Sequence, residues 1–165
     1  MAQLERELTI RSGKGERIAA TFRMPQNGSA FPAVLLCQGL SGVRNLVMPT
    51  VANALADAGI ASLRFDYVGH GDSSGDRGWI DPFARVADAR YVLSYLIGMQ
   101  EVDPHRVGVY GHSYGGPVAL HVAAADPEVR AAVTVSGPGN GQAMLRAPRP
   151  AWDWVELKKR VAADR

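Results

Sequence analysis

The chain has 165 residues, about the length of one domain, and 47% of them are hydrophobic and 21% charged. This composition excludes a disordered protein, which has too few hydrophobic residues to form a core. The net charge is only +2, and the basic residues are scattered apart from a short run at 158–160, which excludes an extended nucleic-acid surface.

The first 25 residues predict two strands, at 4–10 and 18–24. The segment between them, 12–16, contains two glycines and a serine, which are typical of a turn that joins a hairpin. We therefore expect the chain to enter a sheet with an antiparallel pair of strands.

From residue 32 onward, short apolar runs alternate with helical periodicity. The runs, at 33–37, 60–65, 107–110 and 131–135, are typical of buried strands. Strands that alternate with helices need crossovers, and right-handed crossovers produce a doubly wound sheet. The predicted fold class is therefore α/β, with a doubly wound, mostly parallel sheet that begins with an antiparallel hairpin.

Two helices are expected between these runs. One covers 51–58, where apolar residues recur at the spacing of a single helical face, and Gly59 marks its end. The other begins at Asp81 as N-cap, followed by a proline, and ends at Gly98. Its buried side chains are predicted to be those of Phe83, Val86, Leu93 and Ile97.

The only cysteine, Cys37, lies in the apolar run 33–37 and has no disulfide partner in the chain. This placement predicts a core residue and a reducing compartment. The N-terminus has no apolar segment of signal-peptide length, and no stretch approaches the length of a membrane span. We expect a cytoplasmic protein with no membrane span.

After residue 135 the sheet pattern stops at a segment rich in glycine and proline. Beyond it, Trp154, Leu157 and Val161 share one face of a predicted helix. This helix is either the first helix of a lid over an active site or a surface helix at the domain edge. We accordingly divide the chain into a core of about six strands, 1–140, and the start of a lid or cap, 141–165.

A GxSxG motif is formed by Gly111, Ser113 and Gly115. It directly follows the 107–110 strand and opens an apolar helix, the context in which a sharp turn exposes a nucleophilic serine at the carboxyl end of a sheet. The helix N-terminus also favours negative charge that develops beside the serine. Ser113 is therefore the predicted nucleophile, and the alternative is a glycine-rich turn with an incidental serine.

Together with two upstream segments, this motif resembles the α/β-hydrolase family over residues 4–150. The segment 38–42, which reads QGLSG, is similar to the family's HGxxG oxyanion loop, with Gln38 where histidine is usual. The segment 66–73 is very like the family's DxxGxGxS turn, in which Asp66 and His70 would be structural. Within the family, the chain most resembles compact esterases, such as feruloyl or acetyl esterases, and acyl-peptidase-like members.

The resemblance implies an oxyanion hole built from the backbone N–H groups of Leu40 and Tyr114. Gln38 and His112 would bind substrate or support the loop. No cofactor and no metal ion are expected. The expected partner is a small-molecule acyl ester, and no nucleic-acid partner is expected.

In the resembling enzymes, an acidic residue and then a histidine follow the serine along the chain. No histidine occurs after His121. The triad acid and histidine are therefore expected to be absent, so that the fold is incomplete at the C-terminus. An open edge at the sixth strand would then favour self-association or pairing with another chain.

These observations predict a serine hydrolase that acts on carboxylic esters or related acyl compounds through an acyl-serine intermediate, active only with further C-terminal residues. Two alternatives stay open. The chain could be a truncated, catalytically inactive fragment, or an acyltransferase that passes the acyl group from the same serine to an alcohol, amine or thiol.

Overall fold

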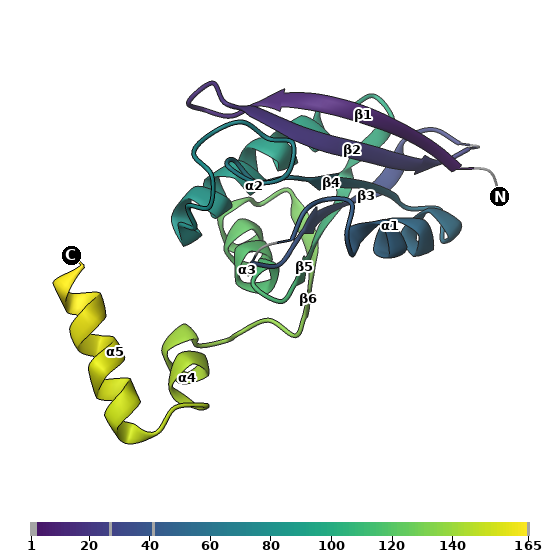
Figure 1. Cartoon of the computed structure of the whole chain (residues 1–165). Coiled ribbons are helices and arrows are strands. Elements are labelled where there is room, and N and C mark those ends of the chain that lie inside the picture. The colour runs from purple at the N-terminus through teal and green to yellow at the C-terminus, as the bar shows by residue number, and fades with distance from the viewer. Residues whose placement is uncertain (1–2, 27, 41, 165) are drawn as a thin grey trace.

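The computed structural model describes residues 3–26, 28–40 and 42–164. A sheet in the order β1-β2-β4-β3-β5-β6 forms the centre of the molecule (Figure 1). Its strands are β1 (Gln3–Arg11), β2 (Arg17–Pro25), β3 (Phe31–Cys37), β4 (Ala61–Phe65), β5 (Val102–His112) and β6 (Val129–Val135).

The strands run as the sequence predicts. β1 and β2 form an antiparallel hairpin, and β2 is antiparallel to β4. The strands β4, β3, β5 and β6 are mutually parallel. The predicted fold class, a mostly parallel sheet that begins with an antiparallel hairpin, is confirmed. β5 begins five residues earlier than expected, at Val102. Its pairing with β3 has a register irregularity between Phe31 and Ala33 of β3. Pro104, which cannot donate a backbone hydrogen bond, is tolerated in β5 at this irregularity.

Helices lie on both faces of the sheet. Helix α1 (Met48–Asp57) packs on one face against Leu36. Helices α2 (Pro82–Ile97) and α3 (Gly115–Ala125) pack on the other face, where the larger apolar core lies. Cys37 is buried in this core, and burial raises the pKa of its thiol to about 12, so that the thiolate does not form at neutral pH.

The end of α1 explains the role of the glycine predicted to stop it. Gly59 has φ +81°, the left-handed conformation that closes a Schellman motif. The N–H of Ile60 donates to the carbonyl of Leu55 at 2.9 Å, and the N–H of Gly59 donates to that of Ala56 at 3.1 Å. The chain is thereby turned directly into β4.

Helix α2 begins as predicted, and of its four residues predicted to be buried Leu93 is buried while Val86 and Ile97 pack partly buried against the core. Asp81 caps it by accepting from the N–H groups of Phe83 and Ala84 at 2.7 and 3.2 Å. The prediction that Phe83 is buried is wrong, because this side chain is 82% exposed. The buried residues of the helix are Arg85, Asp88, Ala89, Val92, Leu93 and Leu96. The buried face of α2 therefore begins with two charged residues, Arg85 and Asp88. Apolar periodicity alone does not predict that charged residues are buried.

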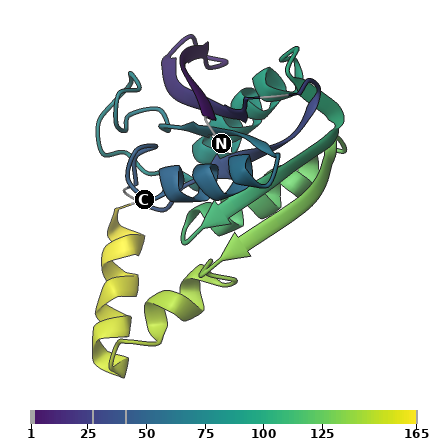
Figure 2. The same ribbon diagram turned by 90° about the vertical axis from the view of Figure 1, so that its right-hand side faces the viewer.

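Beyond β6 the chain forms α4 (Gly141–Arg146) and α5 (Ala151–Ala163), which extend away from the sheet (Figures 1 and 2). The sequence predicts α5 but not α4, whose cap is Asn140 accepting from the N–H of Ala143 at 2.8 Å. In the part of the chain that the structure describes, no helix combines the length and apolar character needed to cross a membrane.

Candidate active site

Ser113 occupies a tight turn between β5 and α3. Its φ is +53°, a left-handed conformation that costs a non-glycine residue on the order of 1–3 kcal/mol and that clusters at functional sites. Two backbone hydrogen bonds hold the turn: Ser113 N–H donates to the Val135 carbonyl at 2.8 Å, and Gly116 N–H donates to the Ser113 carbonyl at 2.9 Å. The strained serine is thus fixed by the ends of two neighbouring strands.

The two glycines of the motif are required by close backbone approach. A Cβ atom on Gly111 would lie 2.1 Å from the carbonyl oxygen of Gly115. A Cβ atom on Gly115 would lie 2.1 Å from the carbonyl oxygen of Cys37 and 2.7 Å from that of Gln38. The absence of these side chains lets α3 begin directly against the end of β3.

The 38–40 segment lies beside the serine. A Cβ atom on Gly39 would come within 3.4 Å of Ser113 Cβ and 3.8 Å of Ser113 Oγ. Neither Leu40 N–H nor Tyr114 N–H donates a hydrogen bond to any group in the described residues. Both predicted oxyanion donors therefore belong to segments next to Ser113, and their role stays a prediction.

The side chain of Gln38 is buried under this loop. Its Nε2 donates to the carbonyl of Phe65, which ties the loop to the end of β4, while Oε1 has no partner among the described residues. This contact favours support of the loop over contact with substrate. The ring of His112 is half-buried, and it forms no hydrogen bond within the ranges that the structure describes.

Asp66 is a buried structural carboxylate, as its place in the 66–73 turn suggests. It accepts from the N–H of Arg44 at 2.6 Å and from the N–H of Asp72 at 3.0 Å, and it pairs with the Arg44 guanidinium. A Cβ atom on Gly71 would collide with it at 2.2 Å. Asp66 thus joins the segment after the 38–42 loop to the 66–73 turn and has no contact with Ser113 in the described structure.

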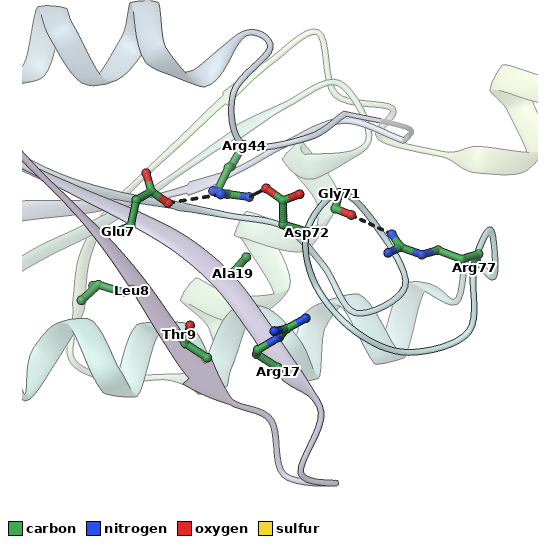
Figure 3. A pocket seen from close by; sticks show the side chains of 9 residues that line it. All are labelled: Glu7, Leu8, Thr9, Arg17, Ala19, Arg44, Gly71, Asp72 and Arg77. Carbon is green, nitrogen blue, oxygen red and sulfur yellow. Dashed lines mark hydrogen bonds and ion pairs between the residues drawn. The ribbon is translucent and has the colours of Figure 1, made fainter.

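A hollow of about 480 Å³ lies beside this ion network, where β1 and β2 meet the 66–73 turn (Figure 3). In it, Arg44 points between Glu7 and Asp72, with ion pairs of 3.1 and 2.8 Å. Arg77 donates to the Gly71 carbonyl at 2.7 Å. Ser113 and the 38–40 segment do not line the hollow. We therefore assign it to the network that holds the turn.

Arg85 is a site residue that sequence reasoning missed. Its side chain reaches from α2 to the 38–40 segment, where Nη1 donates to the Gly39 carbonyl at 3.1 Å and Nη2 to the Leu40 carbonyl. The guanidinium also lies over the rings of Tyr67 and Tyr114, 4.6 and 5.4 Å from their centroids. The signal that could have found it is its spacing, since Arg85 precedes the buried Ala89 and Val92 by four and seven residues.

His70 and Asp88 surround this arginine. Since arginine can only donate, His70 Nε2 accepts from Arg85 Nη2 at 3.1 Å, and Nδ1–H therefore donates to the Val68 carbonyl at 3.1 Å. Asp88 accepts from the Val68 N–H at 2.9 Å. Burial raises the pKa of Asp88 to about 6, although this hydrogen bond opposes the shift.

The side-chain oxygen of Ser113 forms no hydrogen bond to another side chain in the described residues. Neither a histidine nor a carboxylate is hydrogen-bonded to Ser113 Oγ there. His105 and His121 are exposed, and His70 is engaged with Arg85. The geometry therefore presents a strained serine and two free N–H groups without a base to activate the serine.

Helices α4 and α5 enclose a second, more apolar hollow of about 590 Å³. Leu145 of α4 faces Trp154, Leu157 and Val161 of α5 across it. The apolar face predicted for the last helix thus lines a space shared with α4.

The chain is similar to proteins of several names. It is 35% identical over 130 residues to an "uncharacterized 31.7 kDa protein in traX-finO intergenic region" of Escherichia coli, covering 79% of this chain and 46% of that protein. It is 32% identical over 122 residues to "acyltransferase drtE" of Aspergillus calidoustus, and this match covers 73% of this chain and 40% of that protein. The chain thus spans less than half the length of these relatives.

Among solved structures, the chain resembles Est1E from Butyrivibrio proteoclasticus, determined with bound ferulic acid. The TM-score is 0.73 at 26% identity, and the match covers 79% of this chain and 52% of Est1E. A family model described as "alpha/beta hydrolase fold" matches residues 32–163, which include the 38–42 loop, the 66–73 turn and Ser113. The chain belongs to the α/β-hydrolase fold family.

Proposed function

We propose that the protein is a serine hydrolase that cleaves carboxylic esters or related acyl compounds through an acyl-serine intermediate. The observation that carries the proposal is the left-handed backbone of Ser113 at the start of α3, with Gly39 packed against its side chain. Strain of this kind persists only where the surrounding structure imposes it. The similarity to Est1E supports an ester as the substrate class.

In the proposed mechanism, Ser113 Oγ attacks the acyl carbonyl carbon while a base accepts the hydroxyl proton. The negative charge that develops on the carbonyl oxygen is bound by the N–H groups of Leu40 and Tyr114, two fixed donors that need no reorganisation during the step. Collapse of the tetrahedral intermediate expels the alcohol, protonated by the same base. Water then releases the acid in the reverse sequence and regenerates Ser113.

The base and the acid that orients it come, in this proposal, from polypeptide other than the described residues. The support is geometric, since Ser113 Oγ has no basic partner among those residues. Gln38 supports the oxyanion loop through its bond to Phe65, His112 remains a candidate for substrate contact, and residues 141–163 form a lid whose apolar hollow takes the acyl group.

Hydrolysis of 4-nitrophenyl acetate tests the proposal. The product of the complete coding sequence is expected to hydrolyse this ester, and Ser113→Ala is expected to lower kcat by at least roughly 10⁴-fold with little change in KM. The 165-residue chain alone is expected to be far slower. Equal activity of the Ser113→Ala variant would overturn the assignment of the nucleophile.

Acyl transfer is a second candidate, favoured by the similarity to the protein named acyltransferase drtE. The same acyl-serine would then pass its acyl group to an alcohol, amine or thiol. Adding hydroxylamine or a thiol to the assay distinguishes the two. Transfer that outcompetes hydrolysis at millimolar acceptor would favour the transferase, whereas unchanged release of the free acid would favour the hydrolase.

The edge strand β6 supports the remaining alternative, a fragment that pairs with another chain. Val133 and Val135 of this strand are 52% and 41% exposed. An exposed strand edge is a template for pairing. Light scattering of the 165-residue chain shows whether a second copy covers the edge, and a monomer at all concentrations would remove self-association as the way in which the edge is paired.

A further inference from the structure

The guanidinium of Arg85 joins the two segments that carry the proposed oxyanion donors. It is 2% exposed and donates to the carbonyl groups of Gly39 and Leu40 on one side. On the other side it lies over the ring of Tyr114, whose backbone N–H is the second donor. One side chain of α2 thus contacts both the loop and the serine turn.

Burial of the Arg85 guanidinium costs free energy, because the charge is removed from water. Burial lowers the pKa of its guanidinium, yet the group stays charged at neutral pH because arginine is not deprotonated in proteins. No carboxylate among the described residues is hydrogen-bonded to it, and its Nε has no partner there. Asp88 acts on it only through space. Its hydrogen bonds go instead to the 38–40 segment and to His70, so that a buried positive charge is held against the proposed oxyanion loop, which points to a role beyond packing.

The geometry of one peptide unit gives that role. The carbonyl of Gly39 and the N–H of Leu40 belong to the same planar peptide group, and no cis peptide bond occurs among the described residues. In a trans peptide the N–H points opposite to the C=O. A carbonyl held by Arg85 therefore fixes the direction of the Leu40 N–H, which points away from α2.

The bond also changes the strength of that donor. A charged donor on a carbonyl oxygen withdraws electron density from the peptide group, and hydrogen bonds linked through one peptide reinforce each other. The Leu40 N–H consequently becomes a stronger donor to an anion. The positive charge of the guanidinium also lies within the low-dielectric region of the site, where it acts on developing negative charge with little screening.

We propose that Arg85 is a positioning residue for the reaction, which orients and polarises the Gly39–Leu40 peptide so that the Leu40 N–H binds the oxyanion. This inference rests on the function proposed for Ser113. The planar fork of Arg85 is needed, because its two ends hold two successive carbonyl groups. His70 Nε2 completes the arrangement by accepting from the same nitrogen, Nη2, that donates to Leu40.

The sequence allows this peptide to be observed alone. Gly-Leu occurs once in the chain, at Gly39-Leu40. Labelling with [¹³C-carbonyl]glycine and [¹⁵N]leucine therefore gives a single cross-peak in a carbonyl-to-amide correlation experiment. This peak reports the Gly39 carbonyl and the Leu40 N–H together. The matched control is Arg90→Met on the same helix, because the guanidinium of Arg90 is 49% exposed and pairs instead with Asp126, at 2.9 and 3.0 Å.

For Arg85→Met we expect the carbonyl and amide nitrogen signals of this peak to move upfield and the Leu40 amide to exchange faster with solvent. Arg85→Lys, which keeps the charge but can hold one carbonyl at a time, is expected to fall between wild type and Arg85→Met. Arg90→Met should leave the peak in place. A peak unchanged in both Arg85 variants would overturn the proposal. If Arg85→Met does not fold, the Gly39–Leu40 peak of Arg85→Lys is the test, and an unchanged peak in this variant would overturn the proposal.

Kinetics provide the second measurement, on the product of the complete coding sequence. Arg85→Met should lower the first-order rate of Ser113 modification by a fluorophosphonate by roughly 10- to 100-fold with its binding constant unchanged, since an oxyanion donor acts mainly in the transition state. Arg85→Lys should recover part of this rate. An unchanged rate in Arg85→Met, with the peptide peak moved, would limit Arg85 to loop structure and overturn its part in the reaction.

Failure of the proposed function is distinguishable from failure of this inference. If wild-type protein is not modified at Ser113, the serine hydrolase proposal fails, and the Gly39–Leu40 peak alone decides whether Arg85 orients this peptide. If Ser113 is modified but both Arg85 variants match wild type in peak and rate, the function stands and the inference is wrong.

Discussion

The backbone N–H of Ser113 donates a 2.8 Å hydrogen bond to the carbonyl of Val135, the last residue of edge strand β6. The next residues reinforce this contact, since Gly137 packs against Gly116 at the start of α3. The conformation of the serine turn therefore depends on the pairing of β6 with β5. Ser113 is thus held by a strand whose side chains Val133 and Val135 are exposed.

Close approach of backbone at Gly115 predicts a large loss of stability on adding a methyl group. In Gly115→Ala the new Cβ would meet the Cys37 carbonyl oxygen at 2.1 Å, so β3 and α3 must separate. We expect a loss of about 2–3 kcal/mol in the free energy of unfolding, measured by urea denaturation. The control Gly139→Ala faces open space and should change stability by less than about 0.5 kcal/mol. Equal stabilities would contradict the described packing.

Breaking the buried ion pair of Asp66 and Arg44 is expected to lower the free energy of unfolding more than breaking the more exposed pair of Asp126 and Arg90. Asp66→Asn leaves the Arg44 guanidinium without its buried counter-charge and should lower stability by about 2–4 kcal/mol. Asp126→Asn removes the partner of Arg90, which is 49% exposed, and should cost about 0–1 kcal/mol. Similar losses in the two variants would show that Asp66 is less buried than described.

Asp88 predicts a specific pH dependence of stability. Burial raises its pKa to about 6 in the folded protein, whereas an unfolded aspartate titrates near pH 3.9. Between about pH 4 and 6 the folded state binds a proton that the unfolded state lacks, so this residue's contribution to stability falls as pH rises through that window.

Asp88→Asn removes this titration and keeps an oxygen that can accept from Val68. We expect it to match wild type near pH 4 and to be more stable by roughly 1–2 kcal/mol above pH 7. Urea denaturation at a series of pH values measures this difference. Parallel stability curves for the two proteins would show that Asp88 is not the group responsible.

A methyl group added at Gly39 is expected to lower activity without lowering the stability of the fold. In Gly39→Ala the methyl group would lie 3.8 Å from Ser113 Oγ and would narrow the space beside this oxygen, where the proposed function places the acyl group. We expect esterase activity of the complete protein to fall at least about 10-fold, with stability changed by less than about 1 kcal/mol. Gly42→Ala is the control, because its methyl group would contact the Gln38 side chain instead, at 3.5 Å. Equal losses of activity in the two variants would contradict a role in the reaction for the space between Gly39 and Ser113.

The sequence was a good guide to the sheet and the serine turn because their signals are local. Apolar runs mark β3 and β4, Asp81 and Gly59 mark helix ends, and the two glycines of the motif mark backbone contacts around Ser113. Each of these depends on residues close in the chain. The resulting expectations of strand order and fold class needed only the general rules of strand connection.

The parts that could not be predicted depend on distant partners. Arg85 is buried because the carbonyl groups of Gly39 and Leu40, 46 and 45 residues away, accept hydrogen bonds from it. Apolar periodicity predicts a charged residue such as Arg85 at the surface and an apolar residue such as Phe83 in the core. Both predictions are wrong, because periodicity takes no account of contacts with distant parts of the chain. The sequence does not predict helix α4, because a helix of 6 residues is too short to show a period.

The most direct test of the central claim is the site of covalent modification by a fluorophosphonate. The product of the complete coding sequence is treated with the probe, digested and sequenced by mass spectrometry. Ser136→Ala is the matched control, because Ser136 has nearly the same left-handed backbone as Ser113, with φ +54°, and follows the neighbouring strand. We predict modification at Ser113 that persists in Ser136→Ala and disappears in Ser113→Ala. Modification that survives in Ser113→Ala would contradict the assignment of Ser113 as the nucleophile.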